Sequence, residues 1–138
     1  MDKKFLLLVL IPFLVGCDMS EKSLQDDDII VPEITHHNYF EVEDKTITWQ
    51  KAFEINLPDY FIYCYSPTCS HCSEIKDLMI ETALSRNDIF FVKSSEKDKI
   101  VYDVSKSIGA TTPEQIMILG YPTVVEIKDK ILVKNVAG

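Results

Sequence analysis

The residues with the clearest chemistry in this 138-residue chain are two cysteines separated by two residues, in Cys69-Ser70-His71-Cys72. The pair lies between an apolar, aromatic-rich run and a segment with helical spacing. Two intervening residues bring both thiols to one helical turn, and the first thiol then lies at the helix N-terminus, where free N–H groups favour a thiolate. Because the thiolate is the form that attacks a disulfide, Cys69 is the candidate nucleophile and Cys72 the candidate resolving thiol. His71 can add positive charge beside Cys69.

Cysteine and histidine are also metal ligands, so the same residues leave a second kind of site open. The candidate ligands of a zinc or copper ion are Cys69, Cys72, His71 and one of His36 and His37. The spacing from Cys64 to Cys69 and Cys72 matches the first three ligands of a plant-type iron–sulfur cluster, but no fourth cysteine follows in the sequence. Cys64 is therefore interpreted as a small core residue, and the two histidines, in a polar stretch, are typical of solvated side chains.

Two strands and a helix are predicted around the cysteines. Residues 60–65 form an apolar run typical of a strand buried on both faces, and Ser66-Pro67-Thr68 ends it. Residues 69–85 have helical spacing, and residues 89–92 are typical of a second strand. The apolar face of the predicted helix consists of Cys72, Ile75, Leu78, Met79 and Ala83.

Further helices and a hairpin are predicted in the rest of the chain. Thr48 can cap a short helix whose apolar residues are Trp49, Ala52 and Phe53. A longer helix is predicted over residues 99–108 and ends at Gly109; its inward residues would be Ile100, Val101, Val104 and Ile108. Residues 123–127 and 131–133 are predicted to pair as a β-hairpin. The order β-α-β-α-β-β predicts an α/β fold with a mixed sheet and helices packed on it.

A second motif, Gly120-Tyr121-Pro122-Thr123, directly precedes the predicted hairpin. Together with a C-x-x-C pair between a strand and a helix, it gives residues 38–138 a clear resemblance to the thioredoxin superfamily. The resemblance implies a thioredoxin-like fold, with a mixed central sheet flanked by helices, in which Pro122 is a cis-proline placed against the cysteines. It also implies that the backbone of Tyr121 pairs with an extended substrate segment. The substrate-binding residues would then be Tyr121, Pro122 and Ser70.

The resemblance further implies a thiol-disulfide oxidoreductase whose redox-active disulfide joins Cys69 and Cys72, with no dissociable cofactor. Its partners would be protein or peptide thiols and disulfides, together with a membrane or extracytoplasmic electron-transfer partner. A histidine before the second cysteine is similar to the oxidising and isomerising branches, which favours an oxidant or isomerase over a strong reductant. The alternatives are a copper- or zinc-handling lipoprotein and a redox-silent adapter of the same fold.

Two departures from the superfamily are visible in the sequence. Tyr63 occupies the position, six residues before Cys69, where many thioredoxins carry a buried acid, so the proton shuttle assigned to that acid lacks its residue. The sequence also stops at Gly138, where the last helix of the family normally begins. The C-terminal helix is therefore expected to be missing, either because the sequence is truncated or because a partner covers that face.

The N-terminus is typical of a signal for export. Lys3 and Lys4 precede an uncharged apolar run over residues 5–15, which is the pattern of a secretory signal. The ending Leu14-Val15-Gly16-Cys17 resembles the lipobox of bacterial lipoproteins, which implies cleavage before Cys17 and a diacylglyceryl group on its thiol. The predicted organisation is a signal peptide over residues 1–16, an acidic tether over 17–37 and a thioredoxin-like domain over 38–138.

Composition excludes some classes of protein. The formal net charge is −8, which argues against a nucleic-acid binder because phosphate partners favour a basic surface. No apolar run reaches the roughly 18 residues that a membrane-spanning helix needs. We therefore expect the domain to lie on the extracytoplasmic face of the cell membrane, held by its lipid, where disulfides can form and persist.

Overall fold

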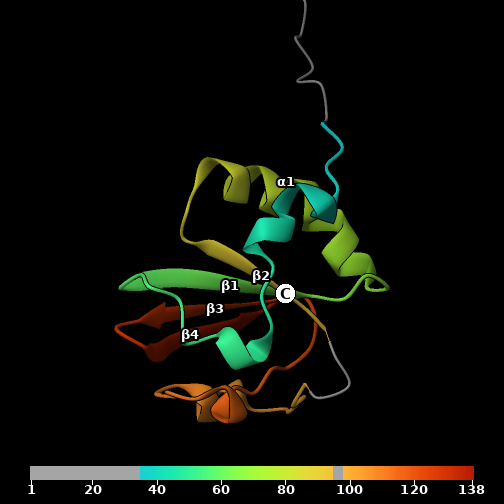
Figure 1. The fold of residues 1–138 in the computed structure, drawn as a ribbon. Helices are drawn as coiled ribbons and strands as arrows, with labels where there is room; N and C mark the ends of the chain where they lie inside the picture. Colours follow the sequence, from blue (N-terminus) through green and yellow to red (C-terminus); the bar gives the residue numbers. More distant parts are fainter. Residues whose placement is uncertain (1–34, 95–97) are drawn as a thin grey trace, which may run out of the picture. The chain divides into compact units, whose positions relative to one another are not determined.

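A mixed β-sheet runs through the part of the chain that the computed structural model describes, which is residues 35–94 and 98–138 (Figure 1). In that part the sheet has four strands: β1 (Asp59–Tyr65), β2 (Ile89–Lys93), β3 (Thr123–Lys128) and β4 (Ile131–Ala137). Their order is β2-β1-β3-β4, with β1 parallel to β2, and with β3 antiparallel to both β1 and β4. The predicted mixed sheet and hairpin are confirmed, whereas the predictions for residues 1–34, Cys17 included, lie outside the described residues.

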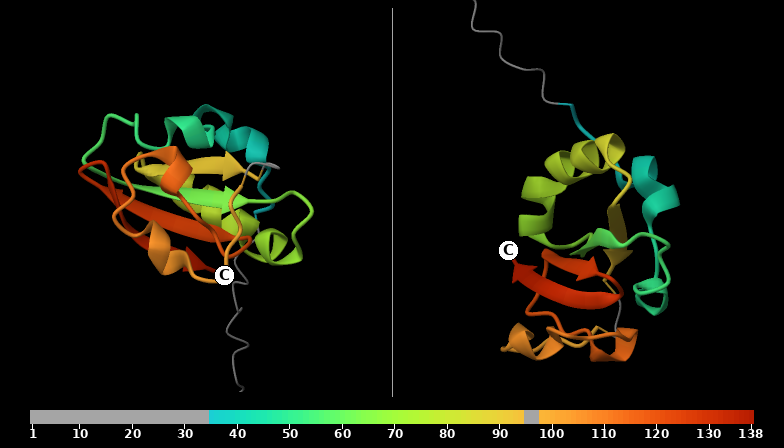
Figure 2. Two further views of the ribbon diagram at one scale, coloured as in Figure 1. Left: turned by 90° about the horizontal axis from the view of Figure 1, so that it is seen from below. Right: turned by 90° about the vertical axis from the view of Figure 1, so that its left-hand side faces the viewer.

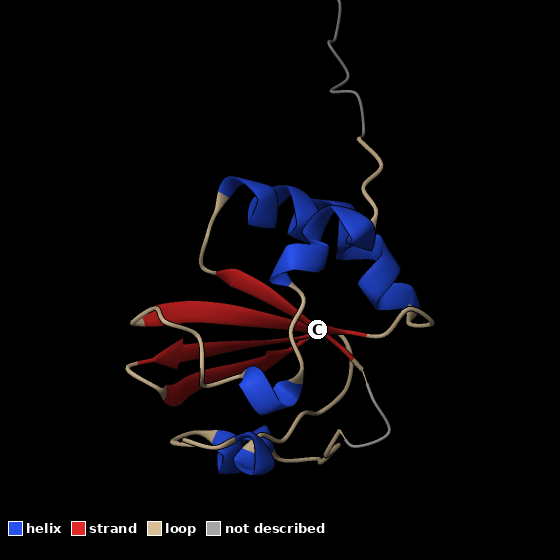
Figure 3. Cartoon of the chain, in the orientation of Figure 1, coloured by secondary structure: helices blue, strands red, loops and turns tan. Residues whose placement is uncertain are grey.

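Helical segments cover both faces of the sheet (Figure 2, Figure 3). The helix α1 (Ser70–Ser85) and the 3-10 helix η1 (Tyr39–Lys45) pack on one face. The other face carries the 3-10 helices η2 (Trp49–Lys51), η3 (Val104–Ser107) and η4 (Pro113–Gln115). None of the helices in residues 35–94 and 98–138 combines the length and the apolar character that crossing a membrane requires.

The central strand β1 is buried on both faces, as its aromatic-rich sequence predicts. On the α1 side, Tyr63 and Tyr65 pack with Phe91 of β2 against the buried side chains of α1. Tyr39 of η1 stacks on Tyr65 with ring centroids 3.9 Å apart, which closes this cluster at one end. The parallel pairing of β1 with β2 thus places the end of β1, where the cysteine motif begins, inside a rigid aromatic layer.

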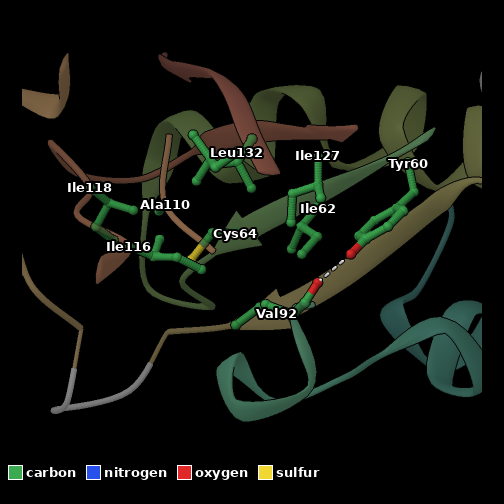
Figure 4. Close-up of a cluster of buried hydrophobic side chains, with 11 residues drawn as sticks. Tyr60, Ile62, Cys64, Val92, Ala110, Ile116, Ile118, Ile127 and Leu132 are labelled. Atoms are coloured by element: carbon green, nitrogen blue, oxygen red, sulfur yellow. Dashed lines mark hydrogen bonds between the residues drawn. The ribbon is translucent and has the colours of Figure 1, made fainter. Parts of the chain in front are cut away.

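The opposite face of the sheet holds a second apolar cluster, shown in Figure 4. Tyr60 closes one end of it by donating a hydrogen bond from its hydroxyl to the carbonyl of Ala52, at 2.8 Å. Cys64 is fully buried in this cluster beside Ile116 and Ile118 (Figure 4). Burial raises the pKa of the Cys64 thiol far above its ordinary value, so this cysteine is an inert core residue.

The helix α1 follows its predicted bounds, with Cys69 as the residue that caps its N-terminus. Its other end is fastened by Lys45, whose ammonium group donates to the carbonyls of Ala83 and Arg86. The inward face differs from the prediction at one position, because Leu78 is 64% exposed and Ile80 is fully buried instead. The run from residue 75 to 80 contains four large apolar side chains, so spacing alone does not select the inward ones.

The helix predicted over residues 99–108 is wrong. Ile100 instead forms a parallel bridge with Ile118, and only Val104–Ser107 adopt a 3-10 turn. Ile100 and Ile108, predicted to point inward, are 60% and 48% exposed. Asp103 accepts hydrogen bonds from the backbone N–H and the hydroxyl of Ser105, which begins a new turn in the middle of the predicted helix. Four β-branched residues in this segment also lower its helix propensity.

The two 3-10 helices before β1 both differ from the prediction. The predicted helix after Thr48 is only the 3-10 turn η2, although its apolar residues pack as expected against the core, with Ala52 fully buried. The 3-10 helix η1 has no counterpart in the prediction. It begins at a capping box in which Asn38 accepts from Phe40 N–H and Glu41 accepts from Asn38 N–H.

Side-chain hydrogen bonds attach the irregular segment to the sheet. Asn135 of β4 donates from Nδ2 to the Ser107 hydroxyl at 2.9 Å and to the Met117 carbonyl at 2.7 Å. Ser107 is fully buried and donates to the Val104 carbonyl at 2.8 Å. Asn135 therefore joins β4 to two residues of this segment, Ser107 and Met117.

We predict that Asn135→Ala lowers the free energy of unfolding by about 1 to 2 kcal/mol, because the Ser107 hydroxyl and the Met117 carbonyl each lose a partly buried hydrogen bond. The measurement is urea unfolding, with Lys134→Ala as a matched control on the exposed neighbour in the same strand. Equal stability of the two variants would show that the side-chain bonds of Asn135 do not hold this segment.

Candidate active site

The two cysteines lie where the central strand gives way to α1. After β1 the chain turns through Ser66-Pro67-Thr68, and Cys69 adopts an extended conformation as the N-cap of α1. Its sulfur accepts a hydrogen bond from the backbone N–H of Cys72, with a donor–acceptor distance of 3.2 Å. The sulfur thus takes the place of the oxygen that usually caps a helix, and the N–H groups and dipole of α1 stabilise negative charge on it.

The turn before β3 contacts the same sulfur from the other side. The thiol of Cys69 donates to the carbonyl of Tyr121, with sulfur and oxygen 3.3 Å apart. The Tyr121–Pro122 peptide bond is cis, as the resemblance implies, and Pro122 is buried. Residues more than 50 positions apart in the sequence therefore meet at the sulfur of Cys69.

The two thiols have different surroundings. Cys69 is partly exposed, whereas Cys72 is 1% exposed and faces the aromatic layer of β1 and β2. Burial, together with the adjacent Cys69 sulfur, raises the pKa of Cys72 to about 11. Both are free thiols in this structure, so at neutral pH the exposed sulfur is the one that can attack and the buried one stays protonated.

Two tyrosines form the floor beneath Cys72. The buried hydroxyls of Tyr39 and Tyr63 make no hydrogen bond of ordinary geometry, but they lie close enough to interact with each other, and Tyr63 interacts with Cys72. Burial raises the pKa of Tyr39 to about 12 and that of Tyr63 still further. Both phenols are therefore neutral at physiological pH, and Tyr63 supplies no ionised group beneath Cys72.

Ser70 and His71 lie on the outside of the first turn of α1, and both are exposed. The Nδ1 atom of His71 is 3.6 Å from Oε2 of Glu74, one turn further along the helix. Among the described residues, neither Ser70 nor His71 makes a side-chain hydrogen bond to Cys69. Any positive charge on His71 therefore acts on the Cys69 sulfur only at a distance, and the Glu74 carboxylate and solvent weaken this electrostatic effect.

The described residues contain no group of three or more histidine, cysteine or acidic side chains that could hold a metal ion. His36 and His37 contact carboxylates instead of the cysteines. His36 Nδ1 lies 3.3 Å from an Asp77 carboxylate oxygen, and His37 Nδ1 lies 2.9 Å from Oε2 of Glu41. His37 is only 10% exposed in its side chain, so the prediction that both histidines are solvated is wrong for His37.

Sequence reasoning missed residues that contact this site from other elements. Asp98 follows β2 and accepts hydrogen bonds from Trp49 Nε1, at 2.7 Å, and from the Tyr121 hydroxyl. Tyr39 reaches the floor of the site from η1. These contacts join residues 23 to 49 positions apart, and no local spacing pattern in the sequence marks them.

No model of a known protein family matches this chain, and no curated protein matches it in sequence. The solved structures that are similar to it include three thioredoxins. Thioredoxin f2 of Chlamydomonas reinhardtii is 16% identical, with 67% of this chain and 82% of that chain covered and a TM-score of 0.43. Oxidised mitochondrial thioredoxin 3 of Saccharomyces cerevisiae is 17% identical, with 68% and 82% covered and a TM-score of 0.42. Oxidised thioredoxin O2 of Arabidopsis thaliana is 15% identical, with 68% and 83% covered and a TM-score of 0.41.

The arrangement of this chain's own elements defines the fold. A parallel β1-α1-β2 unit is followed by the antiparallel hairpin of β3 and β4, with a C-x-x-C pair at the start of α1 and a cis-proline directly before β3. The chain has a thioredoxin-like fold.

Proposed function

We propose that this chain is a membrane-anchored, extracytoplasmic thiol-disulfide oxidoreductase that exchanges disulfides with proteins or peptides through Cys69 and Cys72. The observation that carries the proposal is the unequal environment of the two thiols. The Cys69 sulfur is partly exposed and receives an N–H from the start of α1, whereas Cys72 lies buried one turn inside the helix. One sulfur is therefore suited to attack and the other to resolve.

Both steps of the exchange conserve atoms and electrons. The Cys69 thiolate attacks one sulfur of a substrate disulfide, forms a mixed disulfide and releases the other substrate sulfur as a thiolate, which takes up a proton. Cys72 then loses its proton and attacks the Cys69 sulfur, so that the Cys69–Cys72 disulfide forms and the second substrate thiol leaves. Two electrons pass from the dithiol to the substrate, and the reverse sequence oxidises a substrate dithiol.

The direction of transfer follows from the reduction potential of this pair. Disulfide donors of this chemistry lie near about −120 mV and reductants near about −270 mV. The N–H from Cys72 favours a Cys69 thiolate and the Tyr121 carbonyl favours the thiol, so the support for the oxidising side is the similarity of His71 to the oxidising and isomerising branches. The partner that resets the pair would be a membrane or extracytoplasmic dithiol or disulfide protein, since the cysteines themselves are the redox group.

Substrate would lie over the exposed sulfur of Cys69. Ser70 borders this sulfur on the helix side, and the Tyr121-Pro122 turn borders it on the side of β3. By the resemblance, the backbone of Tyr121 would pair with an extended peptide, and Ser70 is exposed where such a peptide would pass. Anchoring is supported by the sequence Leu14-Val15-Gly16-Cys17, which would hold the domain close to a membrane-bound partner.

The different protonation of the two thiols predicts selective alkylation of the reduced protein. With a pKa near 11, Cys72 is a thiolate in only about one molecule in a thousand at pH 8. Iodoacetamide at this pH should modify Cys69, while Cys72 and the buried Cys64 react only after unfolding. Peptide mapping by mass spectrometry measures this order, and equal labelling of Cys69 and Cys72 in the folded protein would contradict the assignment of their roles.

The direct test of the proposal is to trap the mixed disulfide. Cys72→Ser should accumulate a covalent adduct with a peptide or protein disulfide, because Cys69 can attack but nothing resolves the product. Cys69→Ser should form none. Adding Cys64→Ala to Cys72→Ser provides a matched control, because Cys64 lies in the opposite core and its removal should leave the adduct unchanged. Non-reducing gels and mass spectrometry report the adducts.

The alternatives give other outcomes in the same variants. An adapter that uses the fold only to hold a partner would keep its biological activity after Cys69 and Cys72 are both replaced by serine. A metal carrier would purify with stoichiometric metal that is lost when Cys69 is replaced. Either result would overturn the oxidoreductase proposal.

The anchoring part of the proposal has its own test. Cys17→Ser should move the protein from the membrane fraction to the soluble exported fraction, because the thiol that accepts the lipid is gone. Processing of the unaltered chain should be sensitive to globomycin. A free Cys17 thiol in the mature protein would refute the lipid anchor while leaving the thiol chemistry of Cys69 and Cys72 intact.

A further inference from the structure

The carboxylate of Asp98 joins two elements on the side of the sheet opposite α1. Its Oδ1 atom accepts a hydrogen bond from Trp49 Nε1 at 2.7 Å, and its Oδ2 atom accepts one from the Tyr121 hydroxyl. Both interactions are partly buried and involve a charged acceptor, which makes them stronger than bonds between neutral groups. Trp49 itself packs against the apolar cluster of this face. The bond from Trp49 therefore fixes one carboxylate oxygen of Asp98, and the other oxygen binds the Tyr121 hydroxyl.

Tyr121 connects Asp98 to the reactive sulfur. Its ring packs against the apolar clusters on both faces of the sheet, and its carbonyl accepts the Cys69 thiol at 3.3 Å. Burial and the bond to Asp98 raise the pKa of the Tyr121 hydroxyl, so this group remains a donor throughout the physiological range. The side chain of Tyr121 therefore binds Asp98, and the backbone of Tyr121 contacts Cys69.

We infer that Asp98 is a positioning residue for substrate, which fixes the Tyr121 side chain and thereby sets where the backbone of the Tyr121-Pro122 turn lies relative to Cys69. The inference rests on the proposed function, because the turn is taken to be where the substrate peptide binds. Anchoring the ring limits rotation of the Tyr121 side chain, and the adjoining backbone is held with it. Binding that depends on this backbone requires the turn in its observed place before the peptide arrives.

This role separates two kinds of substrate. A peptide disulfide would use the turn for binding, so loss of the Asp98–Tyr121 bond should weaken its binding. A small disulfide such as hydroxyethyl disulfide needs only an accessible Cys69 sulfur. The turn's carbonyl accepts from the protonated thiol, so releasing it removes an interaction that favours the thiol and does not reduce attack by the thiolate.

The test compares four variants in single-turnover oxidation of the fully reduced protein, followed by quenching and alkylation. Asp98→Ala removes both bonds, and Tyr121→Phe removes one hydroxyl. Asp98→Asn keeps an oxygen for Trp49 and an N–H₂ donor for the Tyr121 hydroxyl, and serves as the conservative rescue. Glu114→Gln is the matched control, because Glu114 lines the same cavity of about 740 Å³ as Asp98, and in the described part of the chain no hydrogen bond joins Glu114 to Tyr121.

The probes are an extended peptide with one intramolecular disulfide and hydroxyethyl disulfide. Asp98→Ala and Tyr121→Phe should raise the half-saturating peptide concentration about five- to tenfold, with the rate on hydroxyethyl disulfide not reduced. Asp98→Asn should restore most of the peptide affinity, and Glu114→Gln should match the unaltered protein. Thermal unfolding monitors the fold, and Tyr121→Phe decides the question if Asp98→Ala does not fold.

Two results would overturn the role of Asp98. One is an unchanged half-saturating peptide concentration in Tyr121→Phe and Asp98→Ala, and the other is an equal loss on both probes, which would indicate general damage to the site. A different result would refute the proposed function and this inference together. In that result, neither probe oxidises Cys69 and Cys72 of the unaltered protein to a disulfide. The outcomes are distinguishable because the unaltered protein is measured first.

Discussion

The rest of the site depends on one interaction, the placement of the Cys69 sulfur at the N-terminus of α1. The sulfur accepts the N–H of Cys72, and the four residues 66–69 connect the end of β1 to the start of α1. The strand β1 is an inner strand of the sheet, with a parallel neighbour on one side and an antiparallel neighbour on the other. The antiparallel neighbour β3 then brings the Tyr121-Pro122 turn to the same end of β1, against the sulfur.

The unequal thiols follow from where the helix meets the sheet. Three positions separate Cys69 from Cys72, which is enough to turn the second side chain inward onto the tyrosine layer while the first remains at the surface. Burial keeps Cys72 protonated at neutral pH. The floor beneath it consists of neutral phenols, so in the proposed exchange the proton of Cys72 would pass to the leaving thiolate or to water.

Much of this architecture could be predicted from sequence, because the strands are short runs of apolar residues and the cysteine motif lies between two of them. The cis-proline was implied by the resemblance that the cysteine motif and the Gly120-Tyr121-Pro122-Thr123 motif carry together. The parts that failed have physical reasons. Leu78 and Ile80 are equally apolar, and only packing decides which one is buried. Residues 99–108 have helical apolar spacing, but Asp103 and Ser105 form a local turn and Ile100 pairs with Ile118. Contacts of Asp98 join distant residues and leave no spacing pattern at all.

The loss of a regular helix on that face is connected to the inferred role of Asp98. A helix satisfies its own backbone groups, whereas an irregular segment must find partners elsewhere, and here Asn135 provides two of the bonds that it needs. Asp98 lies between η2 and the turn before β3, and two residues later Ile100 forms a parallel bridge with Ile118. A helix over residues 99–108 would have buried Ile100 and Ile108 and constrained where Asp98 could lie. Asp98, directly before this irregular segment, contacts the turn that faces Cys69, so the wrong helix prediction and the contact that sequence reasoning missed lie in the same part of the chain.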